Sequence, residues 1–368
     1  MIKFTFIFII LYWLLVRTKG TKNVDRYTII CAVLFFIMMG FRNQAIFGDT
    51  YRYVTWFSQL GNTSLLNVMQ SFEKDQFFWI VAYYVYPLVG GNYTLWLSLI
   101  SLAIILPITK MIKSYSVEPM YSWILFIFLG FATFFMAGMR QTMAMSLTML
   151  GFLILLDEKR KTKEKLLRFV ICIGIASLFH GASLLCLIAI LFINRPFSKP
   201  FLIIYPILLL VFLVLGRFIL FSLTSTLGEY DERYIAYAED AVGSTFTYFF
   251  QQLILIVPSF YILRKRLNEP LIATLYHFSS LGLLLISLSP VIAELFRASY
   301  FFSWANILLF PMAIQQVRRE KSFMPLVFLL FFVVYLIFIN KEAWADYYFW
   351  FEDTSKILRE YDVREIVM

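Results

Sequence analysis

One of the two histidines in the sequence, His180, lies in a short break between apolar runs at residues 166–179 and 181–194. Each run would make about 21 Å of helix, less than the roughly 30 Å thickness of a bilayer's hydrocarbon core. We therefore expect the turn to leave His180 in a recess beside small residues. An imidazole exchanges its proton near neutral pH, so His180 is a candidate general base or substrate ligand. A hydrogen-bonded structural histidine is the alternative, and it is our interpretation of His277, which lies inside an apolar run.

Two arginines stand where a charge needs a partner. Arg140, followed by Gln141, separates the apolar runs 121–136 and 142–156, and Arg42 opens the first long polar segment. A guanidinium in or near hydrocarbon costs about 2.5–3.5 kcal/mol on insertion scales, and its planar fork matches two phosphate oxygens. Both arginines are therefore candidate phosphate ligands. The alternative for each is an arginine that extends toward lipid headgroups.

A third arginine, Arg297, lies at the end of another apolar run, three residues after Glu294 and three before Tyr300. Side chains at this spacing are neighbours on a helix, so Arg297 and Glu294 could simply form a pair. Otherwise Arg297 supplies a third cation for a phosphate group, with Tyr300 beside it.

The polar segment after Arg42 contains a candidate helix. Asp49 suits a helix N-cap, and Tyr53, Trp56, Phe57 and Leu60 follow at i, i+3, i+4 and i+7. This spacing predicts an amphipathic helix lying on the membrane surface. Asp49 is then either a cap or a candidate base and sugar contact.

The elements that must position these side chains are predicted from hydropathy. Hydrophobic residues make up 61% of the 368 and charged residues only 15%, with a mean hydropathy of +0.78. A soluble surface needs far more charge. Although 19% of residues are aromatic, the runs are apolar on every side and lack the alternation of a β-barrel strand. The sequence therefore predicts an all-α, polytopic transmembrane helical bundle.

We expect about twelve crossings with both termini outside, and a single integral membrane domain over residues 1–368. The stretch 76–109 reads as two short helices split at Gly90-Gly91-Asn92, one of which could be re-entrant. The expected spans are 4–16, 27–41, 76–109, 120–137, 141–156, 166–179, 181–194, 200–221, 244–262, 272–289, 298–313 and 323–340.

Basic residues divide unevenly between the connecting segments. Six of these segments hold 20 of the 32 Lys and Arg, whereas 42–75, 222–243 and 341–368 together hold 8. The positive-inside rule makes the first set cytoplasmic. The second set then faces outward, and we expect it to contribute to an active-site face. Its aromatic and carboxylate side chains suit a sugar site, with an interfacial aromatic belt as the alternative.

Several classes of function are disfavoured. The longest segment outside the expected spans has 34 residues and no phosphate-cradling glycine loop is present, so a nucleotide-binding domain has no place. No zinc pattern stands out, and we expect neither metal nor cofactor. The net charge of +9 is interpreted as cytoplasmic loop retention, and no nucleic-acid partner is expected.

Four short motifs occur in order along the chain. They are Phe-Arg…Gly-Asp-Thr-Tyr-x-Tyr at 41–53, Met-Arg-Gln-Thr-Met-Ala at 139–144, Phe-His-Gly-Ala-Ser at 179–183 and Phe-Arg-x-x-Tyr-Phe at 296–301. Over roughly residues 40–305 the chain resembles the EpsG-like family of bacterial polysaccharide polymerases, which are similar in function to Wzy-type polymerases.

The resemblance implies polymerisation of undecaprenyl-diphosphate-linked oligosaccharide repeat units into exopolysaccharide, capsule or O-antigen. The reaction would occur on the outer face of the bacterial cytoplasmic membrane, by a glycosyltransferase that needs no metal or cofactor. The implied partners are the lipid-linked oligosaccharide, membrane lipids and a chain-length regulator protein. Asp75-Gln76 stands where we would look for Glu-Pro. The matched motifs imply site roles for Arg42, Asp49, Tyr51, Arg140, Gln141, His180, Arg297 and Tyr300.

Two other classes of function stay open. A membrane-bound O-acyltransferase acting on a surface polysaccharide would also use a His-Gly pair in an apolar segment, but the sequence shows no upstream catalytic Asn or Asp in a helix. A flippase or transporter of lipid-linked sugars would be favoured by inverted repeats, and we find none. In the polymerase interpretation, arginines stabilise the departing diphosphate, and His180 or Asp49 takes the acceptor's proton.

Overall fold

The computed structural model describes residues 2–17, 23–72, 75–157, 159, 161–193, 195–227, 232–289, 293–320, 347–355 and 357–358. The chain divides into two compact units, and each is described by itself. The first unit comprises Met1–Ser114, Gly130–Leu184 and Lys341–Met368, and the second comprises Tyr115–Leu129 and Leu185–Asn340.

Helices form the first unit, and its only β-pairing among the described residues is an isolated bridge between Arg42 and Phe349. A short 3-10 helix, Leu60–Asn62, follows α3, and a π-helical turn, Trp13–Arg17, follows α1. The α-helices of this unit are α1 (Ile2–Tyr12), α2 (Val24–Gly40), α3 (Gly48–Gln59), α4 (Leu65–Ser71), α5 (Gln76–Leu88), α6 (Tyr93–Tyr115), α8 (Phe131–Ala137), α9 (Met139–Leu156) and α10 (Thr162–Phe179).

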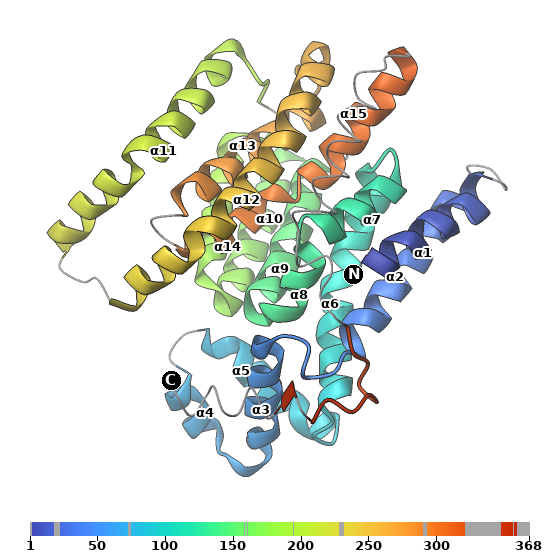
Figure 1. Ribbon diagram of the computed structural model, residues 1–368, viewed down its shortest axis with the longest axis vertical. Helices are drawn as coiled ribbons and strands as arrows, with labels where there is room; N and C mark the ends of the chain where they lie inside the picture. Colours follow the sequence, from blue (N-terminus) through green and yellow to red (C-terminus); the bar gives the residue numbers. More distant parts are fainter. Residues whose placement is uncertain are drawn as a thin grey trace. The chain divides into compact units, whose positions relative to one another are not determined.

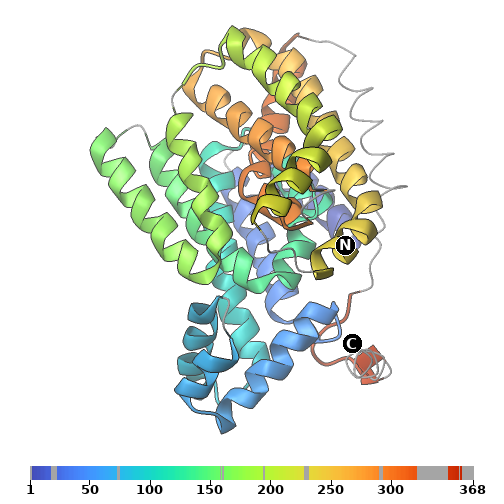
Figure 2. The same ribbon diagram turned by 90° about the vertical axis from the view of Figure 1, so that its left-hand side faces the viewer.

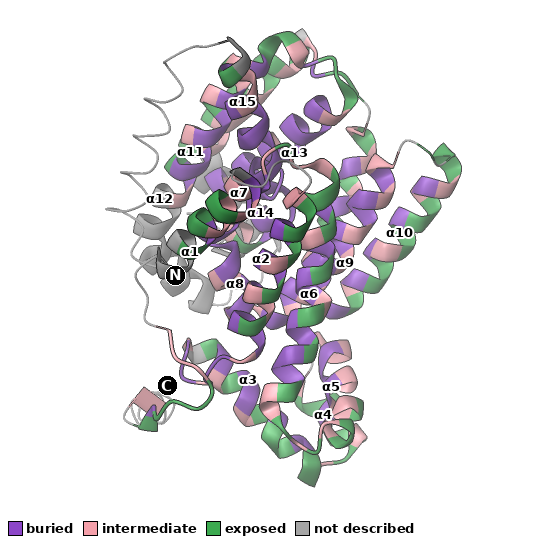
Figure 3. Cartoon of the chain, turned by 90° about the vertical axis from the view of Figure 1, so that its right-hand side faces the viewer, coloured by how far each residue is buried: buried purple, intermediate pink, exposed green. Residues whose placement is uncertain are grey.

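Helices α9 and α10 run side by side, drawn in green in Figure 2. Gly151 of α9 lets the two helices approach closely, because a Cβ there would lie 2.9 Å from a ring carbon of Phe169 on α10. The Phe152 and Phe169 rings pack 5.6 Å apart beside it. Figure 3 shows α9 largely buried and α10 with a stripe of exposed residues. This pair holds Arg140 and His180 at its two adjacent ends.

The amphipathic helix expected after Arg42 is confirmed as α3, which lies with α4 and α5 around one end of α6 (Figure 1). Its apolar face packs on protein: Tyr53 stacks on Trp79 of α5 at 5.7 Å, and Phe57 stacks on Trp96 of α6 at 4.2 Å. These two tryptophans therefore bury the face for which the sequence predicted a lipid surface. Trp56 alone among the four predicted positions stays substantially exposed.

The expected break in 76–109 is also confirmed, since α5 and α6 are separate helices. Gly90 and Gly91 both have positive φ, 59° and 70°, a conformation that glycine adopts without a Cβ clash. The Asn92 side chain then caps α6 by accepting hydrogen bonds from the amides of Thr94 and Leu95. Helix α6 runs to Tyr115, six residues beyond the expected end.

The second unit is helical as well. The Ser122 hydroxyl donates to the Ile307 carbonyl at 2.9 Å and so ties two of its helices together. A Cβ at Gly282 would lie 2.6 Å from the Ser303 hydroxyl, so the helices carrying these residues are in close contact. The α-helices are α7 (Pro119–Phe128), α11 (Lys199–Leu227), α12 (Glu232–Leu263), α13 (Pro270–Leu288), α14 (Ala293–Ser303) and α15 (Asn306–Glu320).

Within the described residues, three helices, α6, α9 and α13, are long and apolar enough to cross a membrane, and α7 with α8 would make a fourth as a broken span. The chain is thus a helical membrane protein, but twelve crossings are not confirmed. Two expected spans differ from a continuous α-helix. Gly130, with φ 76°, divides 120–137 into two helices, and within 181–194 residues Gly181–Leu191 form a 3-10 helix. The last expected span, 323–340, lies outside the described residues.

The expected loop at 222–243 is wrong in extent. Helix α11 continues to Leu227 and α12 begins at Glu232. Hydropathy ends a span where charges appear, whereas a helix continues as long as its backbone hydrogen bonds are satisfied and neither proline nor a cap stops it. Residues 228–231 lie outside the described part of the chain.

Candidate functional site

A cluster of charged and polar side chains in the first unit joins Asp75, Arg140 and His180. One carboxylate oxygen of Asp75 lies 3.3 Å from an Arg140 guanidinium nitrogen and 3.0 Å from Nδ1 of His180. The three side chains are partly buried, with 15% of Asp75 and 31% of both Arg140 and His180 exposed. A carboxyl group, an imidazole and a guanidinium therefore share one partly accessible site.

Local backbone features place each member of this Asp75–Arg140–His180 cluster. Arg140 is the second residue of α9, after the interruption at Gly138. His180 follows α10 as its C-cap residue, and its own amide donates to the Ala176 carbonyl. Asp75 precedes α5 in the left-handed conformation, with φ 58°. Asp tolerates this region better than most residues, and such backbone strain often accompanies functional sites.

Tyr53 of α3 extends the cluster. Arg140 Nε donates to the Tyr53 hydroxyl at 3.0 Å, and the guanidinium carbon lies 5.9 Å from the tyrosine ring centre. Burial raises the pKa of the Tyr53 phenol, against the lowering effect of Arg140. Tyr53 therefore stays protonated at neutral pH and holds Arg140 through Nε, while Asp75 contacts a terminal nitrogen of the same guanidinium.

Asp49 does not cap α3, contrary to the prediction. The helix begins one residue earlier, at Gly48, and Phe47 occupies the cap position with φ 84°. Asp49 is exposed in the first turn, where its charge suits the positive end of the helix dipole. It is close enough to the cluster for its charge to raise the pKa of Tyr53.

Gln141 and Tyr51 lie in the same unit as the cluster. Gln141 follows Arg140 in α9 and is buried, and Tyr51 is half-buried in α3. The first turn of α9, which carries Arg140 and Gln141, has the positive end of a helix dipole, and this favours an anion.

Arg42 has different surroundings, because its side chain is only 1% exposed. Its guanidinium donates to the Met39 carbonyl, and to the Met136 carbonyl at 2.9 Å, with the Met139 sulfur at 3.5 Å. Burial lowers the pKa of Arg42 to about 10, which still leaves it charged at neutral pH. These surroundings differ from those of an accessible cation, and the phosphate role of Arg42 stays a prediction.

Residues 348–354 pack on the loop that carries Arg42. Asn43 is the centre of this contact: its side chain donates to the Glu352 carbonyl at 3.0 Å and accepts from the Thr354 hydroxyl at 2.9 Å. The Trp350 amide donates to the Phe41 carbonyl at 3.0 Å. These hydrogen bonds hold residues 348–354 against the loop between α2 and α3.

Arg297 and Tyr300 belong to the second unit. Both lie on α14, where Arg297 is exposed and Tyr300 is buried, with its ring 5.4 Å from that of Phe296. The side chain of Glu294, the alternative partner of Arg297, lies outside the described part of the structure. The first unit by itself thus brings together Arg140 and His180, with Asp49 near them.

Asp75 was not among the site residues predicted from the sequence, where it stood only as a departure from the family pattern. Its position was the available signal, because Asp75 directly precedes an apolar run. Arginines near apolar runs need partners, and such a carboxylate can supply one. No spacing rule links it to Arg140 or His180, which are 65 and 105 residues away.

The geometry defines what the cluster can do. An ionised carboxylate only accepts hydrogen bonds, so when Asp75 is ionised Nδ1 of His180 donates to it, and in the neutral imidazole Nε2 then presents a lone pair. Arg140 contributes a fixed positive charge. Among the described residues, no group of three or more His, Cys, Asp or Glu is arranged to hold a metal ion.

These features define a helical integral membrane protein with a partly exposed arginine and histidine fixed by one aspartate. The EpsG family model matches residues 25–355, and the chain belongs to the EpsG family. No curated protein and no solved structure matches the chain. The family assigned by resemblance is thereby confirmed, and it indicates a function of the polysaccharide-polymerase type.

Proposed function

We propose that the protein polymerises undecaprenyl-diphosphate-linked oligosaccharide repeat units on the outer face of a bacterial cytoplasmic membrane. The observation that carries the proposal is the shared carboxylate of Asp75, which fixes a proton acceptor, His180, beside a cation, Arg140. A glycosyl transfer from a diphosphate needs these two functions. Membership of the EpsG family supports this class of reaction.

In the proposed step, the bond between the donor sugar's C1 and the diphosphate oxygen breaks, and its electron pair leaves with the diphosphate. A bond forms between C1 and the acceptor hydroxyl oxygen, whose proton passes to Nε2 of His180. Arg140 stabilises the charge that develops on the diphosphate, and the α9 N-terminus adds to it. Asp75 stabilises the imidazolium that results. Asp49 is the second candidate base, and Arg297 a further candidate cation.

The direct test is incubation of the purified full chain with a synthetic undecaprenyl-diphosphate-linked repeat unit. We expect a ladder of longer lipid-linked saccharides and one undecaprenyl diphosphate released for each bond formed. An acyl donor added without a second repeat unit should give no product. Acylated saccharide without chain extension would favour an O-acyltransferase. Movement of intact substrate across vesicles without any new bond would favour a flippase.

The outward location of the site has its own test. In a chain with its three cysteines replaced, single cysteines are introduced at exposed positions, namely Asn62, Ser355, Thr162 and Asn268. An impermeant thiol reagent applied to intact cells should label positions 62 and 355, whereas positions 162 and 268 should react only after lysis. Labelling of position 162 from outside would reverse the orientation and contradict an outward site.

A further inference from the structure

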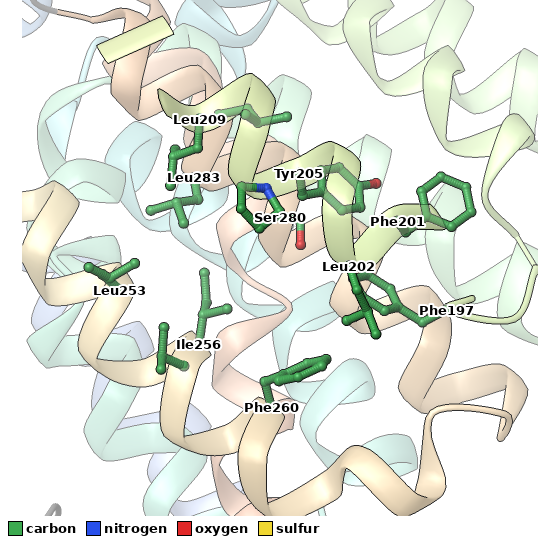
Figure 4. A pocket seen from close by; sticks show the side chains of 13 residues that line it. Phe197, Phe201, Leu202, Tyr205, Leu209, Leu253, Ile256, Phe260, Ser280 and Leu283 are labelled. Carbon is green, nitrogen blue, oxygen red and sulfur yellow. The ribbon is translucent and has the colours of Figure 1, made fainter. Parts of the chain in front are cut away.

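The second unit contains an apolar cavity of about 320 Å³ between α11, α12 and α13. Figure 4 shows Leu253 and Phe260 of α12 facing Leu209 of α11 and Leu283 of α13 across it. Tyr205 and Ser280 bring the polar side-chain atoms of the lining, and the Tyr205 hydroxyl lies 3.1 Å from Nδ1 of His277. The cavity therefore suits a hydrocarbon chain and offers little to a sugar.

Basic residues gather at one end of this cavity. The Phe197 amide lies 3.4 Å from the Leu267 carbonyl, so the segment before α11 is beside the segment after α12. Phe197 lines the cavity, and Arg195 is two residues before it; Arg264 and Lys265 follow within about one turn of the lining residue Phe260. All three basic side chains are exposed.

The two chain segments that carry these basic residues contain one acidic residue, Glu269. Residues 196–228 contain no acidic residue, and residues 265–293 contain only Glu269. Both of its oxygens accept from Arg266, at 2.6 and 2.8 Å, and this pairing lowers the pKa of the Glu269 carboxyl. The end of the cavity thus combines a positive surface with an apolar interior, and this combination matches an anionic amphiphile.

We propose that this cavity binds the acyl chain of an anionic phospholipid whose phosphate lies at Arg195, Arg264 and Lys265. In a helical membrane protein the surrounding phase is lipid, and the adjacent face of α11 is exposed and apolar, with Leu210 64% exposed. The chain enters the cavity from the bilayer while the headgroup stays at its polar boundary. This site is separate from the Asp75–Arg140–His180 cluster and does not depend on the proposed reaction.

The experiment is native mass spectrometry of the purified full chain, titrated with phosphatidylglycerol or with phosphatidylcholine that has the same acyl chains. We expect phosphatidylglycerol to bind at least tenfold more tightly, because each basic residue near an anionic headgroup contributes about 1 kcal/mol and about 1.4 kcal/mol is a factor of ten. The variant Arg195→Ala/Lys265→Ala should lose this preference. The control Lys161→Ala/Lys163→Ala, which removes two exposed lysines of the first unit, should keep it.

A matched pair of substitutions tests the cavity itself. Leu209→Trp fills the cavity and should remove bound phosphatidylglycerol, whereas Leu210→Trp, on the lipid-facing side of the same helix, should not. Equal binding of the two lipids, or equal binding by both tryptophan variants, would overturn the proposal. If Leu209→Trp fails to fold, the charge variants alone decide. Undecaprenyl phosphate that displaces phosphatidylglycerol at equal concentration would overturn the phospholipid assignment.

Discussion

Arg42 and Arg140 look alike in the sequence and differ in the structure. Both stand next to apolar runs, and both were candidate phosphate ligands. Arg42 is 1% exposed and donates to two backbone carbonyls, those of Met39 and Met136. Arg140 is 31% exposed and contacts the side chains of Asp75 and Tyr53.

The two arginines differ in the kind of partner that each one contacts. Carbonyl partners take no proton and carry no net charge, so the Arg42 guanidinium acts as a link between the ends of α2 and α8. The partners of Arg140 are ionisable side chains, and one of them also contacts a histidine. We infer that Arg42 stabilises the turn before α9, and that Arg140 is the residue presented to a diphosphate.

Substitutions of the two arginines should differ most in their effect on turnover. Arg140→Lys keeps the charge but loses the planar fork, and we expect turnover of a lipid-linked repeat unit to fall by roughly 10²–10³-fold, as for loss of one oxyanion-stabilising donor. The unfolding temperature should change little, because the side chain is partly exposed. A variant with near-parental turnover would remove Arg140 from the diphosphate site.

Arg42→Lys should show the opposite pattern. An ammonium cannot reach both the Met39 and the Met136 carbonyl in the same way, and losing a hydrogen bond from a charged donor costs about 1.5–3 kcal/mol. We expect a lower unfolding temperature in detergent, with turnover per folded molecule within a few-fold of the parent. If turnover falls as steeply as in Arg140→Lys while thermal stability is unchanged, Arg42 is a substrate ligand and the comparison fails.

Thr50→Val should have the smallest effect. The Thr50 hydroxyl donates to the same Met136 carbonyl at 3.2 Å, and removing this second donor leaves Arg42 in place. A loss of about 1 kcal/mol in stability is expected, measured by thermal unfolding beside Arg42→Lys. Because either donor alone still pairs the Met136 carbonyl, the double variant, in which neither original donor remains, should be destabilised by more than the sum of the single effects. Full additivity would mean that they do not act on the same turn.

How far the sequence predicted this structure depends on the range of the interactions. The helical class, the amphipathic α3 and the glycine break before α6 were predicted, because each follows from periodicity or from glycine within a few residues. The boundaries at 222–243 and the start of α3 at Gly48 were not. Caps and helix ends depend on tertiary contacts that hydropathy does not record.

The candidate site was predicted in part for the same reason. His180 and Arg140 stood out because a polar residue near an apolar run is rare. Asp75 did not, since an aspartate in a polar segment is common and its two partners are distant in sequence. Nor could the sequence distinguish Arg42 from Arg140, because carbonyl partners such as that of Met136 leave no trace in residue type.

The central claim is that Asp75 and His180 act as one catalytic unit, and a double-mutant cycle tests it most directly. We would measure kcat/KM of the purified parent, Asp75→Asn, His180→Gln and the double variant on a lipid-linked repeat unit. His180→Gln should lower kcat/KM roughly 10²–10⁴-fold relative to the parent. The double variant should have a kcat/KM within a few-fold of that of His180→Gln, because Asp75 acts through the imidazole. Losses that multiply, or a His180→Gln variant within a few-fold of the parent, would contradict the claim and leave Asp49 as the next candidate base.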